Sequence, residues 1–293
     1  MKLIWQSKLV LLLVMPFAGA SLVLQAHWWA VNCWPVAVWT LGLSLLFGLV
    51  VLQLGAATPA AAFAGMAIAA CLMFFTVNFT PAEAIPYAPW HTALVPVLTV
   101  FLLAFLATRL GREGKERHGL GKHRHGRTAA QVAANLGVAA IVSSEPVQSW
   151  LIGFGWFSRA AVAPMPLFAV GLAALAEAAA DTVSSEVGQV LGGRPRMLTT
   201  LRLVEPGTDG GVSLIGTLAG VAAAVLVAAA GSLALGGGRT IFCISCAGAV
   251  FGLFFDSLLG ATLERRGWLN NDAVNFLSTA SAAGFALGVM AIY

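Results

Sequence analysis

Residues 33–54 of the chain read CWPVAVWTLGLSLLFGLVVLQL and contain no charged side chain. A helix needs about 20 apolar residues to cross a bilayer, because the hydrocarbon core is about 30 Å thick and each residue adds about 1.5 Å. This stretch is long enough, and its apolar residues are continuous rather than alternating, which excludes a strand of a membrane β-barrel. Residues 33–54 therefore predict a transmembrane helix.

Further apolar stretches extend this prediction along the chain. The stretch at 128–157 is interrupted by Ser143-Ser144-Glu145-Pro146, where proline removes a backbone donor and is expected to split the helix. We predict an all-α, polytopic transmembrane helical bundle of about nine spans, with one broken or re-entrant segment. The other stretches lie at residues 9–25, 60–79, 90–108, 128–157, 165–190, 212–235, 240–263 and 273–293.

The composition agrees with a membrane protein and excludes a soluble enzyme or a disordered chain. Of 293 residues, 59% are hydrophobic and only 10% are charged, whereas soluble domains average about 25% charged residues. The whole chain, 1–293, is expected to be a single integral membrane domain. Four spans would lie in residues 1–108, a basic cytoplasmic loop in 109–127, and the spans that carry polar motifs in 128–293.

The basic residues predict the orientation, since short loops rich in Lys and Arg stay on the cytoplasmic side. Four groups fall on one side if the amino terminus is cytoplasmic and the fifth stretch crosses once. We therefore expect the amino terminus and the active site to face the cytoplasm, in a bacterial inner membrane or its equivalent. The net charge of +4 indicates contact with anionic lipid rather than with nucleic acid. The groups are Lys2 with Lys8, the loop 109–127, Arg194 with Arg196 and Arg202, and Arg265 with Arg266.

Two of the apolar stretches contain acidic residues. Glu177, Asp181 and Glu186 lie in the stretch 165–190, and Asp256 lies in the stretch 240–263. An ionisable group inside a span costs about 2.5–3.5 kcal/mol on insertion scales, so each is a candidate functional residue. Spacings of three and four residues place most of these groups on one face of their helix. The alternative is that they only hold helices together.

Between these two stretches, residues 205–213 read EPGTDGGVS and open the following span. Glycines permit unusual backbone angles and leave N–H groups uncovered, and the amino-terminal end of a helix favours anions. The loop is therefore a candidate phosphate cradle, although a plain turn before a span would also use Gly and Ser. It is not the P-loop of soluble NTPases, because no Gly-Lys-Ser/Thr follows.

Polar side chains also open two other spans. Arg127, Gln131 and Asn135 recur every four residues at the start of the fifth stretch, and residues 270–275 open the last one with three asparagines and an aspartate. The planar fork of arginine suits phosphate. Asparagines at a helix start are equally explained by ordinary capping.

Together these groups fit a nucleotide bound with Mg²⁺, which prefers one or two carboxylates plus phosphate oxygens and water. Positioning and charge neutralisation supply most of the catalysis of phosphoryl transfer. In a membrane, the acceptor should be a lipid or a long-chain alcohol derivative. A phosphate monoester acceptor would need no general base, because its second ionisation lies near pH 6.

Four motifs then match a known family in order and spacing. They are DTVSSEVG at 181–188, PGTDGGVS at 206–213, DSLLGAT at 256–262 and NDAVNF at 271–276. In these motifs the chain resembles the phytyl-phosphate kinase family of integral membrane proteins. The resemblance implies transfer of a phosphoryl group from a nucleoside triphosphate, with CTP favoured, to phytyl, geranylgeranyl or a similar isoprenyl monophosphate.

The resemblance also implies a role for each matching residue. The catalytic carboxylates around Mg²⁺ would be Asp181, Glu186, Asp209 and Asp256. The nucleotide phosphates would be held by Gly207, Thr208, Gly210, Gly211 and Ser213. The segment from Arg127 to Asn135 also fits the family's pattern for the fifth span. The residues that orient the nucleotide or the acceptor phosphate would be Arg127, Asn135, Asn271 and Asn275.

Other functions stay open on the sequence. A cytidylyltransferase that makes a CDP-activated lipid would use the same ingredients, and it differs in which phosphorus is attacked. A transporter of a phosphorylated lipid or small anion would also suit a broken span and membrane-embedded acids. A scaffold would need its polar residues only for packing. The chain length of the lipid and the oligomeric state are not specified by the sequence.

Overall fold

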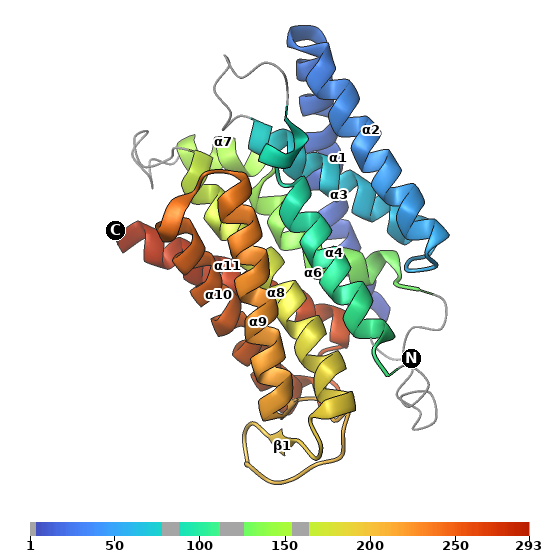
Figure 1. Cartoon of the computed structure of the whole chain (residues 1–293), viewed down its shortest axis with the longest axis vertical. Coiled ribbons are helices and arrows are strands. Elements are labelled where there is room, and N and C mark those ends of the chain that lie inside the picture. The colour runs from blue at the N-terminus through green and yellow to red at the C-terminus, as the bar shows by residue number, and fades with distance from the viewer. Residues whose placement is uncertain (1–3, 78–87, 112–125, 154–163, 293) are drawn as a thin grey trace.

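The computed structural model describes residues 4–77, 88–111, 126–153 and 164–292, and it confirms an all-α polytopic membrane protein. The helices form an elongated bundle, with loops concentrated at its two ends (Figure 1). Most of the predicted basic loop, residues 112–125, lies outside the described residues.

Each predicted apolar stretch contains a helix, and the fifth contains two. Within the described residues, seven helices are long and apolar enough to cross a membrane, and α4 and α6 are shorter apolar helices. The number of crossings stays a prediction. The helices are α1 (Ile4–Asn32), α2 (Trp34–Gln53), α3 (Pro59–Val77), η1 (Pro89–His91), α4 (Leu94–Arg109), α6 (Ala129–Val142), α7 (Glu145–Gly153), α8 (Pro164–Leu191), α9 (Leu214–Ala234), α10 (Gly238–Leu259), η2 (Gly260–Glu264) and α11 (Asn271–Ile292).

The fifth stretch is broken where the proline predicted a break. Helix α6 ends at Val142, and α7 begins at Glu145, directly before Pro146. Between them the Ser144 hydroxyl donates to the carbonyl of Ile141 at 2.6 Å, so a side chain satisfies part of the interrupted backbone. The split itself is confirmed.

Helix α8 lies at the centre of the bundle and carries the acidic motif. Residues 167–180 are buried throughout, with α4, α6, α9, α10 and α11 packed around them. Small residues permit this close packing, as in other membrane helix pairs. At Gly220 of α9, for example, an added Cβ would lie 2.8 Å from the carbonyl oxygen of Ala180. The centre of the bundle therefore fixes α8 tightly against its neighbours.

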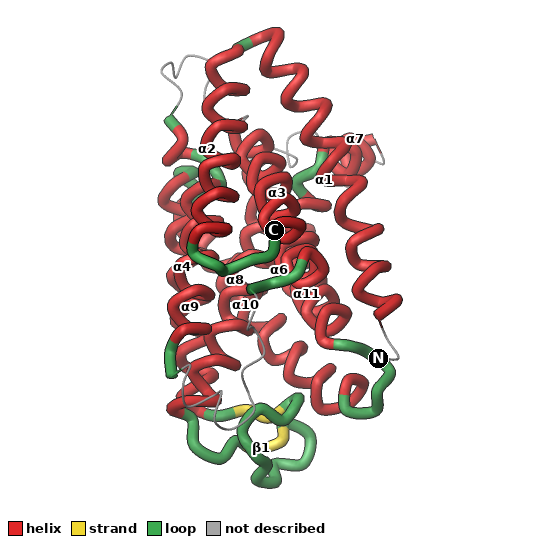
Figure 2. The backbone as a smooth tube through the Cα atoms, turned by 90° about the vertical axis from the view of Figure 1, so that its right-hand side faces the viewer, coloured by secondary structure: helices red, strands yellow, loops and turns green. Residues whose placement is uncertain are grey.

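The helices alternate in direction, so their connections gather at two ends. We call the end that holds the starts of α1, α3, α6, α9 and α11 the site end. There Arg109 Nη2 donates to the carbonyl of Leu54, and the N–H of Arg127 donates to the carbonyl of Ala56. The loop with the small antiparallel pair β1 (Arg196–Met197) and β2 (Gly211–Val212) projects from the same end (Figure 2). Whether this end faces the cytoplasm stays a prediction.

Candidate functional site

Helix α8 brings its acidic residues to the site end. Asp181 is half-buried, and the Ser185 hydroxyl lies 3.4 Å from its Oδ1 one turn further along. Glu186 follows close to the end of the helix. Glu177, one turn before Asp181, is only 1% exposed and lies among α8, α10 and α11 next to Gly252. The helix therefore carries two half-buried carboxylates, Asp181 and Glu186, near its end and one fully buried carboxylate, Glu177, inside the bundle.

The glycine loop 205–213 is shaped by its own turns. The N–H of Thr208 donates to the carbonyl of Glu205 at 3.2 Å, and the N–H of Gly211 donates to the carbonyl of Thr208 at 2.9 Å. Gly207 and Gly210 take positive φ values of 82° and 73°, a conformation that favours glycine. Ser213 ends the loop as the N-cap of α9, where its hydroxyl accepts from the N–H of Gly216 at 3.1 Å.

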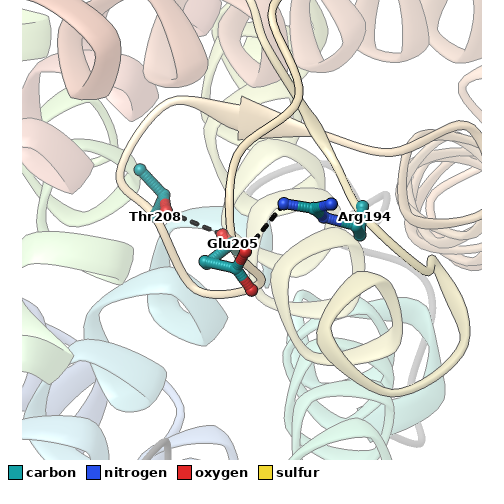
Figure 3. Close-up of polar contacts among 3 residues, drawn as sticks. All are labelled: Arg194, Glu205 and Thr208. Carbon is teal, nitrogen blue, oxygen red and sulfur yellow. Dashed lines mark hydrogen bonds and ion pairs between the residues drawn. The ribbon is translucent and has the colours of Figure 1, made fainter.

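Side chains brace the beginning of this loop from outside. Arg194 Nη2 forms an ion pair with Glu205 Oε1 at 2.9 Å, and the Thr208 hydroxyl donates to the carbonyl of Glu205 at 2.6 Å (Figure 3). The pair is largely exposed, and such pairs contribute roughly 0–1 kcal/mol. Its position matters more than its strength, because Glu205 is the first residue of the turn that contains Gly207.

The loop packs directly on the end of α10. The Cβ of an alanine at Gly260 would lie 2.7 Å from the N atom of Gly210, and a Cβ at Gly210 would overlap the backbone of Ala261. Here α10 continues as the π-helical turn η2, an irregularity found frequently at functional sites. Glycines on both sides therefore let the loop approach the helix that carries Asp256.

Arg127 enters the site from the segment before α6. Its N–H donates to the carbonyl of Ala56, and its carbonyl accepts from the N–H of Thr58, so the α2–α3 connection fixes its backbone. Its Nη2 donates to the Thr182 hydroxyl at 3.4 Å. Burial lowers the pKa of the guanidinium, and the nearby carboxylates of Glu186 and Asp181 oppose that shift. The guanidinium is thus placed among the acids of α8.

Helix α6 then begins with a capping box. The Thr128 hydroxyl accepts from the N–H of Gln131 at 3.3 Å, and the Gln131 side chain accepts from the N–H of Thr128 at 2.8 Å. This reciprocal pair satisfies two backbone donors that the helix itself leaves unpaired. The cap fixes the start of α6 immediately after Arg127.

An amide pair joins α6 to α11. Asn275 Nδ2 donates to Asn135 Oδ1 at 2.9 Å, and Asn271 Nδ2 lies 3.5 Å from Asn275 Oδ1 on the same helix face. Asn135 is buried, so the bond between the two helices is shielded from solvent. The regular spacing of these asparagines in the sequence reflects a real face, although their role stays a prediction.

These elements enclose one pocket of about 290 Å³ at the site end. Every site residue predicted from the sequence lines it. These residues are Arg127, Asn135, Asp181, Glu186, Gly207, Thr208, Asp209, Gly210, Gly211, Ser213, Asp256, Asn271 and Asn275.

The pocket also includes acids that the sequence prediction left out of the site. Glu264 follows Asp256 and Gly260 at a spacing of four, and Asp272 lies between Asn271 and Asn275. Both signals were present in the sequence as continuations of motifs already recognised. Gln131, Thr182 and Ser257 also line the pocket.

The charge of the pocket bears on the predicted Mg²⁺. Six carboxyl groups line it, and Arg127 is the single basic side chain among the described lining residues. Asp256 Oδ1 is buried and has no hydrogen-bond partner within the described part of the chain. A nucleotide phosphate would be repelled by so many carboxylates unless a cation accompanied it. The donor set therefore fits Mg²⁺ brought in with phosphate.

The same carboxylates do not make a metal cage by themselves. Over residues 4–77, 88–111, 126–153 and 164–292, no three His, Cys, Asp or Glu side chains are grouped closely enough to hold a metal ion. Mg²⁺ commonly uses one or two carboxylates and completes its shell with water and substrate phosphate. The pocket is thus suited to a cation that arrives with its substrate.

Comparisons with known proteins give the following relatives. The model of a family described as integral membrane protein DUF92 matches residues 42–283. An uncharacterized membrane protein of Methanocaldococcus jannaschii, MJ0933, is 35% identical over 67% of this chain and 75% of its own length. Another from Synechocystis, sll0875, is 34% identical over 69% of this chain and 75% of its own length.

A plant protein is similar over a shorter part. The chloroplast protein VTE6 of Arabidopsis thaliana is 29% identical over 62% of this chain and 54% of its own length. No solved structure matches the chain.

Proposed function

The chain belongs to the integral membrane protein family DUF92, and from that premise we propose that it is a membrane-embedded isoprenyl-phosphate kinase. It transfers a phosphoryl group from a nucleoside triphosphate, preferably CTP, to phytyl, geranylgeranyl or a similar isoprenyl monophosphate. The similarity to VTE6 supports a function related to prenyl-phosphate kinases.

The observation that carries the proposal is the convergence of the four sequence motifs on one pocket. They come from α8, the glycine loop, α10 and α11, which are separated in the sequence, and all of them line the same cavity. A scaffold has no need to gather six carboxylates, a guanidinium and a glycine loop around one space. A pocket at the end of membrane helices also suits a substrate with a polar head and an apolar tail.

The proposed reaction needs little covalent chemistry from the protein. An oxygen of the acceptor monophosphate attacks the γ-phosphorus, a new P–O bond forms, and the bond from that phosphorus to the bridging oxygen breaks. The products are the isoprenyl diphosphate and the nucleoside diphosphate. Because the second ionisation of a phosphate monoester lies near pH 6, the attacking oxygen is already unprotonated at neutral pH. The protein has to position two polyanions and offset their charge.

The residues divide this work. Backbone N–H groups of the glycine loop and the N-cap Ser213 would bind donor phosphates at the start of α9. Arg127 would neutralise charge on the phosphates, and the amides of Asn271 and Asn275 would orient one of them. Bound Mg²⁺ would supply charge neutralisation, held by carboxylates drawn from Asp181, Glu186, Asp209 and Asp256.

The test is turnover by the purified protein in detergent, with Mg²⁺ and γ-labelled CTP. The acceptors are a panel of isoprenyl monophosphates and the corresponding free alcohols. We expect label in an isoprenyl diphosphate, release of CDP, and loss of both when Mg²⁺ is chelated.

Other products would point elsewhere. Pyrophosphate release with CDP-linked lipid would identify the cytidylyltransferase. If no label reached lipid although CTP and the monophosphate both bound, the kinase proposal would be wrong, and transport of the phosphorylated lipid into proteoliposomes would be measured next.

A further inference from the structure

The first helix holds the segment that precedes α11 through a buried glutamine. Gln6 Nε2 donates to the carbonyl of Trp268 at 2.8 Å, and Gln6 Oε1 accepts from the N–H of Asn270 at 2.8 Å. Gln6 is only 6% exposed. The nitrogen and the oxygen of the Gln6 amide are therefore both hydrogen-bonded, each to a backbone group of a segment more than 260 positions away in the sequence.

The next residue of α1 extends this grip to side chains. The Ser7 hydroxyl donates to Asp272 Oδ2 at 2.6 Å and accepts from Asn270 Nδ2 at 3.0 Å. Asn270 in turn caps α11, because its Oδ1 accepts from the N–H of Ala273 at 2.9 Å. We call Gln6 and Ser7 with these partners the α1 clasp.

The clasp ends directly at the pocket. Asp272 lines the pocket, as do Asn271 and Asn275 in the same first turn of α11. Asn275 is also bonded to Asn135 of α6, so the first turn of α11 is held from two sides. Helix ends fray unless their free backbone groups are satisfied. The clasp satisfies the N–H of Asn270 and fixes where the helix begins.

We propose that Gln6 and Ser7 are positioning residues that hold the amides of Asn271 and Asn275 at the geometry needed for phosphate binding. This inference rests on the proposed kinase function. Helix α1 precedes residues 42–283, which the family model matches, so the comparisons assign no role to it. In this chain α1 acts as a part of the site rather than as a peripheral span.

The structure offers a matched control within the same helix. Gln25 lies 19 positions after Gln6, about 28 Å further along at 1.5 Å per residue. Its Nε2 donates to Glu145 Oε2 at 2.9 Å, at the end of the bundle remote from the pocket. Gln6→Ala and Gln25→Ala therefore remove the same kind of side-chain amide from one helix, and only the first removes contacts to the segment that leads into the pocket.

The experiment compares steady-state kinetics of these two variants with γ-labelled CTP and the best isoprenyl monophosphate. We expect Gln6→Ala to raise the KM for at least one of the two substrates on the order of tenfold, and Gln25→Ala to leave both KM values unchanged. Partial unfolding would lower only the amount of active enzyme, so a change in KM separates positioning from stability. Ser7→Ala should act like a weaker Gln6→Ala, and Ser7→Thr, which keeps the hydroxyl, should restore the KM.

A double-mutant cycle gives the decisive comparison. If Gln6 acts through the α11 amides, Gln6→Ala should have little further effect on KM in an Asn275→Ala background, whereas independent effects would multiply. Equal KM values in Gln6→Ala, Gln25→Ala and the unchanged protein, with turnover intact, would overturn this inference alone. Absence of turnover in the unchanged protein would overturn the proposed function and the inference with it.

Discussion

Two carboxylates, one at each end of the bundle, differ in how their oxygens are paired. At the remote end, Glu145 Oε2 accepts from Gln25 Nε2 at 2.9 Å, and its Oε1 lies 3.4 Å from the Ser149 hydroxyl. At the site end, Asp256 Oδ1 is buried without a hydrogen-bond partner among the described residues. Both side chains are acids in a membrane protein, and a hydrophobicity profile does not distinguish them.

The difference indicates which acid is structural. A buried polar atom costs free energy unless it is paired, so proteins pair nearly all of them. Glu145 is paired by side chains from α1 and α7, which is how a helix contact is stabilised. Among the described residues, Asp256 has a buried, unpaired Oδ1, as Glu177 has an unpaired Oε1, but Asp256 also lines a pocket that five further carboxyl groups share. We interpret that arrangement as a site for a cation and its phosphate ligand.

The largest expected effect is that of replacing the Asp256 carboxylate by an amide, with the same replacement at Glu145 as the control. Asp256→Asn should reduce turnover by about 100- to 1,000-fold, a loss typical of removing one electrostatic contact at a reacting phosphate or oxyanion. Its melting temperature in detergent should be unchanged or higher, because an amide is cheaper to bury than a carboxylate. Glu145→Gln should leave turnover unchanged. Kinetics and thermal melting of the two purified variants test this.

The opposite pattern would contradict the comparison. If Asp256→Asn kept full turnover, or if Glu145→Gln lost as much, the buried oxygen of Asp256 would have no catalytic meaning.

A second contrast concerns arginine. Arg127 lies among the acids of the pocket, and Arg239 is exposed at the start of α10, at the remote end. Arg127→Lys should raise the KM for a phosphorylated substrate by about 10- to 100-fold, because lysine does not reproduce the planar fork and a charged hydrogen bond contributes about 1.5–3 kcal/mol. Arg239→Lys is the control and should behave as the unchanged protein. A normal KM in Arg127→Lys would show that a point charge is sufficient there.

Two glycines give a third contrast, in backbone geometry. Gly210 in the pocket loop and Gly236 between α9 and α10 have φ values of 73° and 65°, so alanine is strained at both, by about 1–2 kcal/mol. At Gly236 a Cβ meets nothing within 4 Å, but at Gly210 it overlaps Ala261. Overpacking at Gly210 should therefore lower the free energy of unfolding of Gly210→Ala by about a further 1–3 kcal/mol. The melting temperature of this variant should fall below that of Gly236→Ala. Gly210→Ala should also reduce turnover about tenfold by displacing the loop, whereas Gly236→Ala should keep turnover.

The sequence predicted the helices and the members of the pocket, because both leave local patterns. A run of about 20 residues without charge predicts a transmembrane helix whatever other segments it packs against. Pro146 likewise predicts the break between α6 and α7 from its own position. The polar residues from Asp181 to Gly188 have the spacing of one helix face. The loop from Gly207 to Ser213 has the glycines of a tight turn. That all these residues line one pocket is a finding of the structure.

What the sequence did not reveal depends on contacts between distant segments. The close approach of Gly210 to Gly260 joins a loop to the end of a helix, and the two segments share no sequence pattern. The clasp of Gln6 on Trp268 and Asn270 starts in a region where the sequence has no distinctive motif. Glu264 lies two residues beyond the motif DSLLGAT at 256–262, so the match to that motif does not include it. Side-chain roles stay predictions because no pattern specifies what a pocket binds.

The smallest expected effect tests whether stability and function separate at helix starts. The Thr128 hydroxyl caps α6 beside Arg127, and the Thr92 hydroxyl accepts from the N–H of Leu94 at the start of α4, at the remote end. Thr128→Ala should reduce stability by about 1 kcal/mol, the usual cost of a lost cap. Thr92→Ala should reduce it by a similar amount, because the Thr92 hydroxyl also donates to the carbonyl of Pro89 and so makes two hydrogen bonds. Only Thr128→Ala should also reduce turnover, by roughly the fivefold that 1 kcal/mol represents, because the cap fixes the segment that presents Arg127. Melting curves and kinetics measured on the same preparations separate the two effects. Equal turnover in both variants would mean that the bond between Arg127 and Ala56 holds the guanidinium without help from the helix cap.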